Sequence, residues 1–388
     1  MNEAPVSTFD TIVIGAGSIG APIAFYLSRT GLRTLVLDST PSVGQGSNKK
    51  AIGGIRATHS DPAKIRLCLR SIDIFSTWKE VYGDDIEWIE CGYSFVAYRE
   101  QEENTLKDLL AIQHSYGLKN FWLDRNNLLE LIPDLNPENL IGGTYSPLDG
   151  SASPLLAIHA FFQHARENGA EFNFNETVTG VVAERGKVRG VITNRGVYHA
   201  PVVINAAGAY ADAVSRLVGM SVPVRPDCHE AAITEAVAPF LKPMVVDIRP
   251  ASGSTNYYFY QHSTGQIVFC ITPSPQIWGD NTLETSQFLP MVARRMVQIM
   301  PRLKNIRVRR TWRGLYPMTP DGFPIVGWSR EVEGYFIAVG MCGQGFMLGP
   351  GLGELISRMV TGDLEAEDQQ VLDFLSPYRQ FVGQEKLK

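Results

Sequence analysis

Three glycine-rich segments, far apart in the chain, carry residue types suited to close contact with a ligand. The first is Gly15-Ala16-Gly17-Ser18-Ile19-Gly20, a complete GxGxxG spacing. The second is the AAGAY sequence at 206–210, and the third is GMCGQGF at 340–346. Small residues let the backbone approach a bound molecule closely. Three such segments indicate a large cofactor that is held by separated pieces of the chain.

The elements around the first segment predict a dinucleotide-binding unit. Residues 11–14 form a short apolar run that is typical of a buried strand. A helical pattern follows, with Ile19, Ile23 and Leu27 at intervals of four, and Gly31 lies where a C-terminal cap is expected. In this arrangement the pyrophosphate lies at the helix N-terminus, where free N–H groups and the helix dipole favour anions.

A second predicted strand, 34–37, ends at Asp38, which follows Gly20 by 18 residues. A carboxylate at this place accepts hydrogen bonds from the ribose hydroxyls and disfavours a 2′-phosphate. NADP is therefore not expected, whereas NAD and FAD both remain open from this motif alone. The polar, glycine-rich stretch 41–54 then interrupts the pattern, and the next dinucleotide-type strand comes only at 202–205. This layout favours FAD.

Composition limits the remaining classes. The 388 residues correspond to two or three domains, and 44% hydrophobic with 19% charged residues is an ordinary globular balance. The net charge of −5 gives no overall basic field for nucleic acid. Five scattered cysteines without a CxxC pair indicate neither disulfides nor a zinc site, and fit a reducing cytoplasm. No metal site is expected, since His159 and His164 are poorly spaced for one helix face.

Two stretches bear on export and on insertion into a membrane. Residues 1–10 are polar and lack the features of a signal peptide. Residues 334–353 contain no charge, but their glycines and Pro350 predict a strand, a turn and a new helix rather than one span. We therefore expect a protein without a transmembrane segment.

Local patterns predict several further elements. Residues 155–169 read as a helix that is capped around Ser153 and Pro154. Residues 257–260 and 266–271 form a hairpin pattern. The residues after Tyr378 look like a loosely held tail. The basic run favours a solvated strand, with a partner-subunit surface as the next interpretation; it comprises Arg302, Lys304, Arg307, Arg309, Arg310 and Arg313.

The sequence resembles the D-amino acid oxidase superfamily of FAD-dependent oxidoreductases over nearly its whole length. The matching features are GAGSIG with Asp38, the loop from Gly46-Ser47 to Ile55-Arg56, VINAAGA at 203–209, the TPD at 319–321 with Tyr316, and GQGFMLGPGLGE at 343–354. Within the superfamily it looks most similar to the β-type catalytic subunits of dye-linked L-proline dehydrogenase and sarcosine oxidase.

The resemblance implies an α/β fold with two domains. One is an FAD-binding, Rossmann-like domain of the glutathione-reductase type, built from 1–83, 149–220 and 313–388. The other is a substrate domain with a mainly antiparallel sheet, built from 84–148 and 221–312.

The resemblance also implies roles for residues of the catalytic site. Arg56 matches the arginine that binds the substrate carboxylate, and a guanidinium can grip both carboxylate oxygens. Tyr258 and Tyr316 match aromatic residues that line the substrate pocket. His229 is interpreted as a structural histidine, and no catalytic base is assigned. The matching residues expected to contact FAD are Gly15, Gly17, Ser18, Ile19, Gly20, Asp38, Ser47, Lys49, Val178, Ala207, Gly208, Gly343, Gly345, Phe346 and Met347.

Three departures from relatives bear on the chemistry. Met347 replaces a lysine that helps to hold the carboxylate in sarcosine oxidases, and no lysine stands near Phe269 and Cys270, where those oxidases have one for oxygen activation. The chain also has no thiol near Gly314 and no histidine at 49–50, so we expect FAD to be bound non-covalently. Lys49 and Lys50 lie near the flavin or its phosphates in one interpretation and are solvated loop residues in the other.

The expected function is oxidation of the C–N bond of a small amino or imino acid, with a secondary amine such as proline, sarcosine or another N-substituted glycine preferred. The alternatives are a glycine or D-amino acid oxidase acting on a primary amine, and a flavin subunit of a dehydrogenase complex. Oxygen or another electron acceptor would reoxidise the flavin. Both a partner subunit and a homo-oligomer are compatible with the resemblance.

Overall fold

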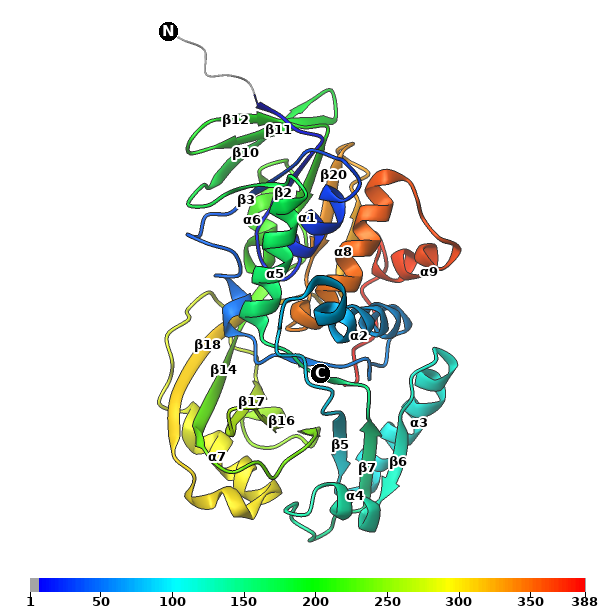
Figure 1. The fold of residues 1–388 in the computed structure, drawn as a ribbon, viewed down its shortest axis with the longest axis vertical. Helices are drawn as coiled ribbons and strands as arrows, with labels where there is room; N and C mark the ends of the chain where they lie inside the picture. Colours follow the sequence, from blue (N-terminus) through cyan, green and yellow to red (C-terminus); the bar gives the residue numbers. More distant parts are fainter. Residues whose placement is uncertain (1–6, 388) are drawn as a thin grey trace.

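A mostly parallel six-stranded sheet forms the centre of the upper half of the molecule, in a computed structural model that describes residues 7–387 (Figure 1). All neighbouring strands are parallel except the pair β19–β20. The strands predicted at 11–14, 34–37 and 202–205 are confirmed. In spatial order the sheet contains β19 (Ile325–Trp328), β20 (Tyr335–Val339), β13 (Val202–Asn205), β2 (Thr11–Ile14), β3 (Thr34–Leu37) and β9 (Glu171–Asn173).

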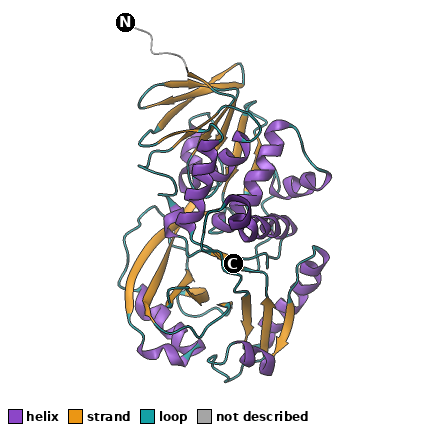
Figure 2. Ribbon diagram, viewed as in Figure 1, coloured by secondary structure: helices purple, strands orange, loops and turns teal. Residues whose placement is uncertain are grey.

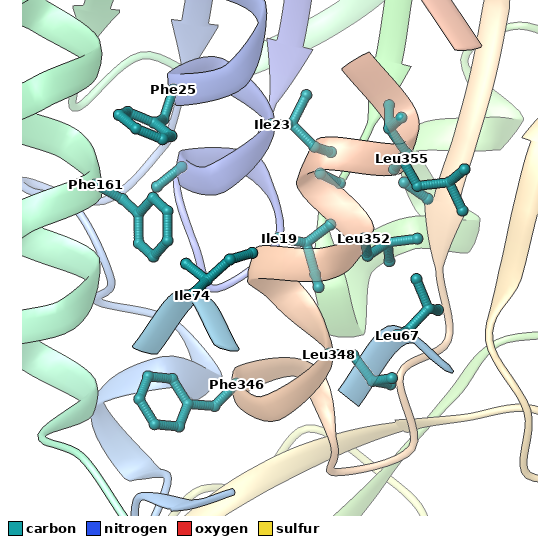
Figure 3. Close-up of a cluster of buried hydrophobic side chains, with 14 of the residues drawn as sticks. Ile19, Ile23, Phe25, Leu67, Ile74, Phe161, Phe346, Leu348, Leu352 and Leu355 are labelled. Atoms are coloured by element: carbon teal, nitrogen blue, oxygen red, sulfur yellow. The ribbon is translucent and has the colours of Figure 1, made fainter. Parts of the chain in front are cut away.

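Helices cover one face of this sheet. Alternate residues of a strand point to opposite faces, so each strand contributes side chains to both layers. Val13 of β2 packs among helix side chains, which form the apolar cluster of Figure 3. The close approach of two of these helices needs glycine, since a Cβ at Gly349 would lie 2.0 Å from the Ser18 carbonyl oxygen. The helices are α1 (Gly20–Ser28), α2 (Pro62–Tyr82), α5 (Pro154–Glu167) and α8 (Gly345–Thr361), with α9 (Ala366–Leu375) packed against α2.

A four-stranded sheet covers the opposite face. Ile12 and Ile14 of β2 pack there with Val188 and Val191. Its strands, in spatial order, are β1 (Ser7–Thr8), β12 (Val197–His199), β11 (Lys187–Thr193) and β10 (Val178–Glu184). The four-stranded sheet, the six-stranded sheet and the helices thus make three layers, which confirms the predicted α/β, Rossmann-like architecture.

An eight-stranded sheet forms the lower half of the molecule (Figures 1 and 2). Every neighbouring pair is antiparallel except β15–β5, and the predicted hairpin is confirmed as β16–β17. The strands, in spatial order, are β18 (Val308–Met318), β14 (Arg225–Ala236), β17 (Gln266–Pro273), β16 (Ser254–Gln261), β15 (Met244–Asp247), β5 (Tyr93–Ala97), β7 (Gly142–Ser146) and β6 (Phe121–Asp124). Helices α3 (Glu100–Ser115), α4 (Arg125–Leu131) and α7 (Phe288–Ile299) pack against it.

Short elements complete the chain. The two-stranded pair β4 (Gly54–Ile55) and β8 (Gly150–Ser151) lies beside the segment that carries Arg56. The other short elements are α6 (Ala211–Arg216) and the 3₁₀ turns η1 (Ser47–Lys50), η2 (Gly208–Tyr210) and η3 (Pro301–Asn305).

Several sequence predictions are tested by these elements. The uncharged stretch 334–353 forms β20, a turn and the start of α8, and no helix within residues 7–387 is long and apolar enough to cross a membrane. Helix α5 begins as predicted, with Ser153 accepting a hydrogen bond from the Leu156 N–H. All five cysteines are free, and within the described range no cluster of ligating side chains could hold a metal.

One prediction is wrong, and a second is wrong at a single residue. The residues after Tyr378 are not a loosely held tail, because Glu385 and Leu387 are only 4% and 1% exposed. The basic run is solvated from Arg302 to Arg310, but Arg313 is buried and donates a hydrogen bond to the Leu283 carbonyl. Arg313 lies opposite Glu230 of β14, which is buried as well.

The division of the chain into two domains stays a prediction. Its boundary at 313 falls inside β18, and the whole strand pairs with β14 as far as Met318 opposite Arg225. The eight-stranded sheet therefore extends a few residues beyond the predicted limit of the substrate domain.

Candidate active site

The turn between β2 and α1 is shaped by its glycines. Gly15 has a φ of +109°, and a Cβ there would lie 2.5 Å from the Ala206 carbonyl oxygen. A Cβ at Gly20 would lie 1.8 Å from the Gly15 carbonyl oxygen, so this glycine lets the helix start tightly against the strand. Gly17 has open space where its Cβ would be. The turn thus presents bare backbone at the N-terminus of α1, which suits a phosphate group.

Asp38 ties the end of β3 to this turn. Its Oδ2 accepts a hydrogen bond from the Ala16 N–H at 2.7 Å, and its Oδ1 accepts from the N–H and Oγ1–H of Thr40 at 2.8 and 2.7 Å. These donors hold the carboxylate at the rim of the cavity described next, where it could also accept hydrogen bonds from ribose hydroxyls.

A cavity of about 1240 Å³ extends from this turn to the eight-stranded sheet. Ligand pockets of roughly 300–1,000 Å³ serve one drug-sized molecule, so this cavity has room for a large cofactor and a small substrate. It forms because parallel strands β3, β2, β13 and β20 end at one edge, which brings their following loops together.

The structure brings nearly all predicted site residues to this cavity. Gly20 is the exception, since it packs against Gly15 instead of lining the cavity. The predicted residues that do line it are Gly15, Gly17, Ser18, Ile19, Asp38, Ser47, Lys49, Arg56, Val178, Ala207, Gly208, Tyr258, Tyr316, Gly343, Gly345, Phe346 and Met347. Lys50 also lines it, while the exposed Lys49 side chain contacts Gln45.

Aromatic side chains form the wall that belongs to the eight-stranded sheet. The hydroxyl oxygens of Tyr258 and Tyr316 are 3.0 Å apart, and burial raises the pKa of both phenols. Gly343 permits this position of Tyr316, because a Cβ at 343 would lie 2.1 Å from the ring. The pair is therefore neutral and can exchange hydrogen bonds with a ligand.

His229 stacks on the Tyr316 ring, with ring centroids 3.7 Å apart and planes 13° apart. Its Nε2 is 3.0 Å from Oδ2 of Asp227. Burial lowers the pKa of His229, although Asp227 opposes this shift, so the imidazole is neutral near pH 7. Sequence reasoning did not place Asp227 in the site; the Asp-x-His spacing was the available signal, because residues two apart share one face of a strand.

Arg56 carries a buried positive charge at the cavity. It is 6% exposed, and its guanidinium donates hydrogen bonds to the carbonyl oxygens of Thr58 and Leu387. Its Nη1 is 3.3 Å from His59 Nδ1, and its Cζ is 5.3 Å from the centre of the Phe95 ring. Within residues 7–387 no carboxylate lies within 4 Å of this guanidinium. An unpaired buried charge is costly, so the site favours an anion beside Arg56.

Asp149 holds the backbone next to Arg56. Its Oδ1 accepts a hydrogen bond from the Ala57 N–H at 3.0 Å, and its Oδ2 lies 3.4 Å from the Thr58 hydroxyl. Burial raises the pKa of Asp149 to about 7, against the attraction of these donors and Arg56. Asp149 therefore does not neutralise the arginine fully. Sequence reasoning did not single out Asp149, because it belongs to no motif that would indicate a role in the site.

The geometry agrees with a comparison against protein families. Residues 10–359 match the family model described as FAD dependent oxidoreductase. The chain belongs to this family. This oxidoreductase therefore uses FAD, and the open backbone at Gly17, the tight turn of Gly15 and Gly20, and the large cavity all fit that cofactor.

Known proteins resemble this FAD-dependent oxidoreductase over more than nine-tenths of its length. It is 28% identical to the hydrogen cyanide synthase subunit HcnC of Pseudomonas aeruginosa, over 91% of this chain and 92% of that protein. It is 25% identical to mitochondrial sarcosine dehydrogenase of Mus musculus, over 95% of this chain but only 41% of that longer protein. The crystal structure of L-proline dehydrogenase from P. horikoshii superposes with a TM-score of 0.90 and 30% identity, covering 96% of this chain and 98% of that one.

This oxidoreductase has no thiol near Gly314, where the resemblance places the cysteine of enzymes with covalently bound FAD. A Cβ at Gly314 would lie 2.8 Å from the Cβ of Lys50, so the lysine stem takes up the space beside this residue. Non-covalent binding of FAD stays a prediction, which acid denaturation tests below.

Proposed function

We propose that this FAD-dependent oxidoreductase oxidises the C–N bond of a small amino or imino acid, with a secondary amine as the preferred substrate. The observation that carries the proposal is Arg56, a buried guanidinium at the cavity without a carboxylate partner in the described chain. A substrate carboxylate supplies the missing anion. Charge-assisted, two-pronged contacts of this kind are among the strongest hydrogen bonds in proteins.

The remaining residues orient the substrate. Tyr258 and Tyr316, with hydroxyl oxygens 3.0 Å apart, offer a donor and an acceptor for the carboxylate or amine. The neutral His229 supports the ring of Tyr316 from behind by stacking. Bound FAD supplies the acceptor for the hydride equivalent, so the protein has to bind, orient and exclude water. No side chain is assigned as a base, because an amine that arrives neutral needs none.

We infer the roles of the cofactor residues from their places around the cavity. Gly15, Gly17, Ser18 and Ile19 would hold the pyrophosphate at the N-terminus of α1, and Asp38 would accept from the ribose. The other cavity residues named above as FAD contacts would surround the flavin and its phosphates.

Two relatives support a secondary amine, since sarcosine and proline are both named as substrates of dehydrogenases that resemble this chain. The side chain at one cavity position supports an electron acceptor other than oxygen. Cys270 lines the cavity, and its strand has no lysine near Phe269 and Cys270, where the resemblance places the lysine for oxygen activation. Oxygen would therefore reoxidise the flavin slowly.

The test is anaerobic reduction of the purified holoenzyme with a panel of small amines. We expect sarcosine or proline to bleach the flavin absorbance faster than glycine or D-alanine, and pyrrolidine, which lacks a carboxylate, to react poorly. Bleaching only by primary amino acids would overturn the secondary-amine assignment. Oxygen and then a soluble dye are admitted to the reduced enzyme, and the rate at which the flavin absorbance returns is measured. Fast return with oxygen indicates an oxidase, and fast return only with the dye indicates a dehydrogenase.

The name of the P. aeruginosa relative, a synthase subunit, favours a second candidate, a flavin subunit of a dehydrogenase complex. Full turnover with a soluble dye by the purified single chain would argue against this alternative. Flavin reduction without steady turnover would support it.

A further inference from the structure

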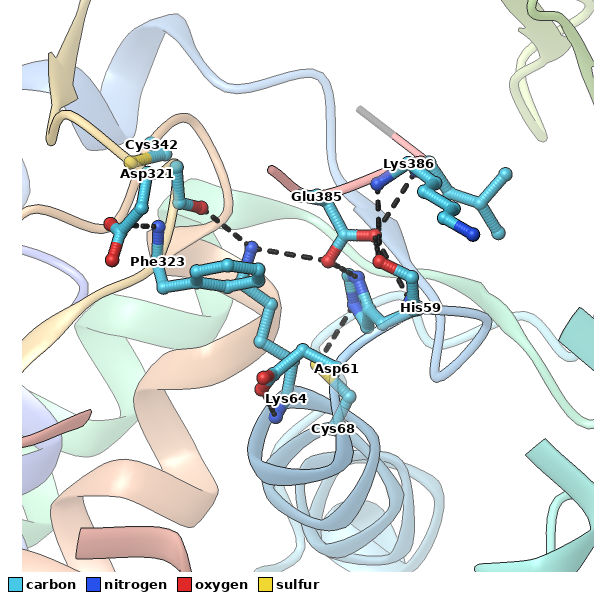
Figure 4. Close-up of polar contacts among 12 residues, drawn as sticks. His59, Asp61, Lys64, Cys68, Asp321, Phe323, Cys342, Glu385 and Lys386 are labelled. Atoms are coloured by element: carbon cyan, nitrogen blue, oxygen red, sulfur yellow. Dashed lines mark hydrogen bonds and ion pairs between the residues drawn. The ribbon is translucent and has the colours of Figure 1, made fainter. Parts of the chain in front are cut away.

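Residues 384–387 lie next to Arg56, with Glu385 and Leu387 buried and Gln384 and Lys386 exposed. Gln384 lines the cavity, and Glu385 and Leu387 are almost completely buried. Figure 4 shows the Glu385 carboxylate between Lys64 of α2 and His59 of the loop before it. A polar stretch that folds back in this way needs strong anchors, since ordering each residue costs backbone entropy.

Glu385 is the main polar anchor. Its carboxylate lies 3.3 Å from Lys64 Nζ and 3.6 Å from His59 Nδ1, and it accepts hydrogen bonds from the N–H and Oγ–H of Ser60 at 3.0 and 2.6 Å. Burial acts to raise its pKa, but Lys64, His59 and Ser60 together hold the pKa well below the usual value. The carboxylate is therefore ionised at neutral pH.

Lys64 is equally committed to this contact. Its side chain is fully buried, and its Nζ also donates to the Gly322 carbonyl at 2.8 Å and lies 4.7 Å from the Phe323 ring centre. Loss of one member of a buried ion pair leaves the other charge uncompensated. The pair thus defines the position of residue 385 closely.

Two residues later the same segment contacts Arg56. The Leu387 carbonyl accepts a hydrogen bond from Arg56 Nη2, and the Leu387 side chain packs in an apolar cluster with Phe95 and Tyr93. Phe95 also lies against the Arg56 guanidinium. The groups that accept hydrogen bonds from Arg56 are the neutral backbone carbonyls of Thr58 and Leu387, so they orient the guanidinium without neutralising its charge. The remaining N–H donors of Arg56 stay available for a ligand.

We propose that Glu385 is a positioning residue for substrate binding: its buried pair with Lys64 holds the segment 384–387 so that the Leu387 carbonyl fixes the orientation of Arg56. This inference rests on the proposed function, in which Arg56 grips the substrate carboxylate. Glu385 contacts neither the cavity nor the substrate, and it acts through Leu387 and Arg56.

The test compares Glu385→Gln with Glu367→Gln in the full-length holoenzyme. Glu367 is a matched control. Its carboxylate lies 3.8 Å from Arg66, which is on α2 like Lys64, but the Glu367 side chain is exposed. The probes are pyrrole-2-carboxylate and its neutral amide, titrated by the change in flavin absorbance. We expect Glu385→Gln to weaken carboxylate binding about 10-fold or more, to raise KM more than it lowers kcat, and to leave binding of the amide and FAD content unchanged.

The outcomes separate this inference from the function on which it rests. If Arg56→Lys weakens carboxylate binding and Glu385→Gln only lowers the melting temperature, the segment is merely structural and the inference is overturned. If neither variant changes carboxylate binding, the role of Arg56 falls as well. Should Glu385→Gln not fold, Ser60→Ala removes one donor from the Glu385 carboxylate and should show a smaller, several-fold loss; unchanged carboxylate binding in that variant would overturn the inference.

Discussion

The guanidinium of Arg56 donates a hydrogen bond to the backbone carbonyl of Leu387, which lies 331 residues further along the chain. The contact joins the loop that follows the dinucleotide-binding unit to the last part of the described chain. It places a neutral acceptor beside a buried cation at the cavity. An arginine that is oriented but not neutralised is suited to bind a carboxylate from solution.

Replacement of Arg56 by alanine should weaken substrate binding while FAD stays bound. A hydrogen bond to a charged group contributes about 1.5–3 kcal/mol, which corresponds to about 10- to 150-fold in the dissociation constant. Arg56→Lys should recover part of this loss, because an ammonium cannot reproduce the planar fork. Titration with pyrrole-2-carboxylate measures the effect, and Arg66→Ala, at a residue of α2 that does not line the cavity, is the control. Wild-type affinity in Arg56→Ala would place the carboxylate site elsewhere.

Acid precipitation should release all of the flavin as free FAD. The chain has no thiol at Gly314, where the resemblance places the attachment of covalently bound FAD, and the Lys50 stem lies against this residue. The supernatant absorbance after precipitation, compared with the flavin content of the native protein, gives the released fraction. A yellow pellet after washing would show a covalent bond and contradict this expectation.

Asp38→Ala should lower FAD retention, because the ribose loses its acceptor and the Ala16 N–H loses its hydrogen bond. Loss of a hydrogen bond to a charged group corresponds to an affinity about 10-fold lower or more. Asp10→Ala is a matched control, since Asp10 accepts the Arg33 N–H at the other end of the same strand and does not line the cavity. Flavin content after dialysis measures retention. Equal flavin content in both variants would limit Asp38 to a structural role.

The buried Asp149 should make stability fall as pH rises from about 4 to 7. Burial raises its pKa from 3.8 to about 7, so in this window the unfolded chain loses a proton that the folded protein keeps. The contribution of Asp149 to the free energy of unfolding is largest below its unfolded-state pKa of 3.8. It declines by roughly 4 kcal/mol at most as the pH rises to its folded-state pKa of about 7.

Asp149→Asn removes this titration and retains an acceptor for the Ala57 N–H. Urea unfolding at several pH values should therefore show a smaller decline for Asp149→Asn than for the wild type between pH 4 and 7. Parallel curves for the two proteins would mean that Asp149 is ionised throughout this range, as an ion pair with Arg56 would require.

The dinucleotide-binding unit could be predicted from the sequence because its determinants are local. The strand at 11–14, the glycine spacing at 15–20 and the strand that ends before Asp38 all lie within 28 residues. Gly20 meets a steric demand within the turn and Gly15 one from Ala206, which follows the neighbouring strand β13, whereas Gly17 leaves the backbone open. The resulting GxGxxG spacing can be recognised directly in the sequence.

The surroundings of Arg56 could not be predicted in this way. The arginine was found through its match to a family position, but Asp149, Glu385 and Leu387 belong to no motif, and the residues after Tyr378 looked like an exposed tail. The burial of Glu385 depends on Lys64, a buried charged residue of α2, which needs a buried carboxylate to compensate its charge. Hydrophobic patterning treats a lysine and a glutamate as surface residues, so only the tertiary structure, in which the two charges meet 321 residues apart, decided where the end of the chain lies.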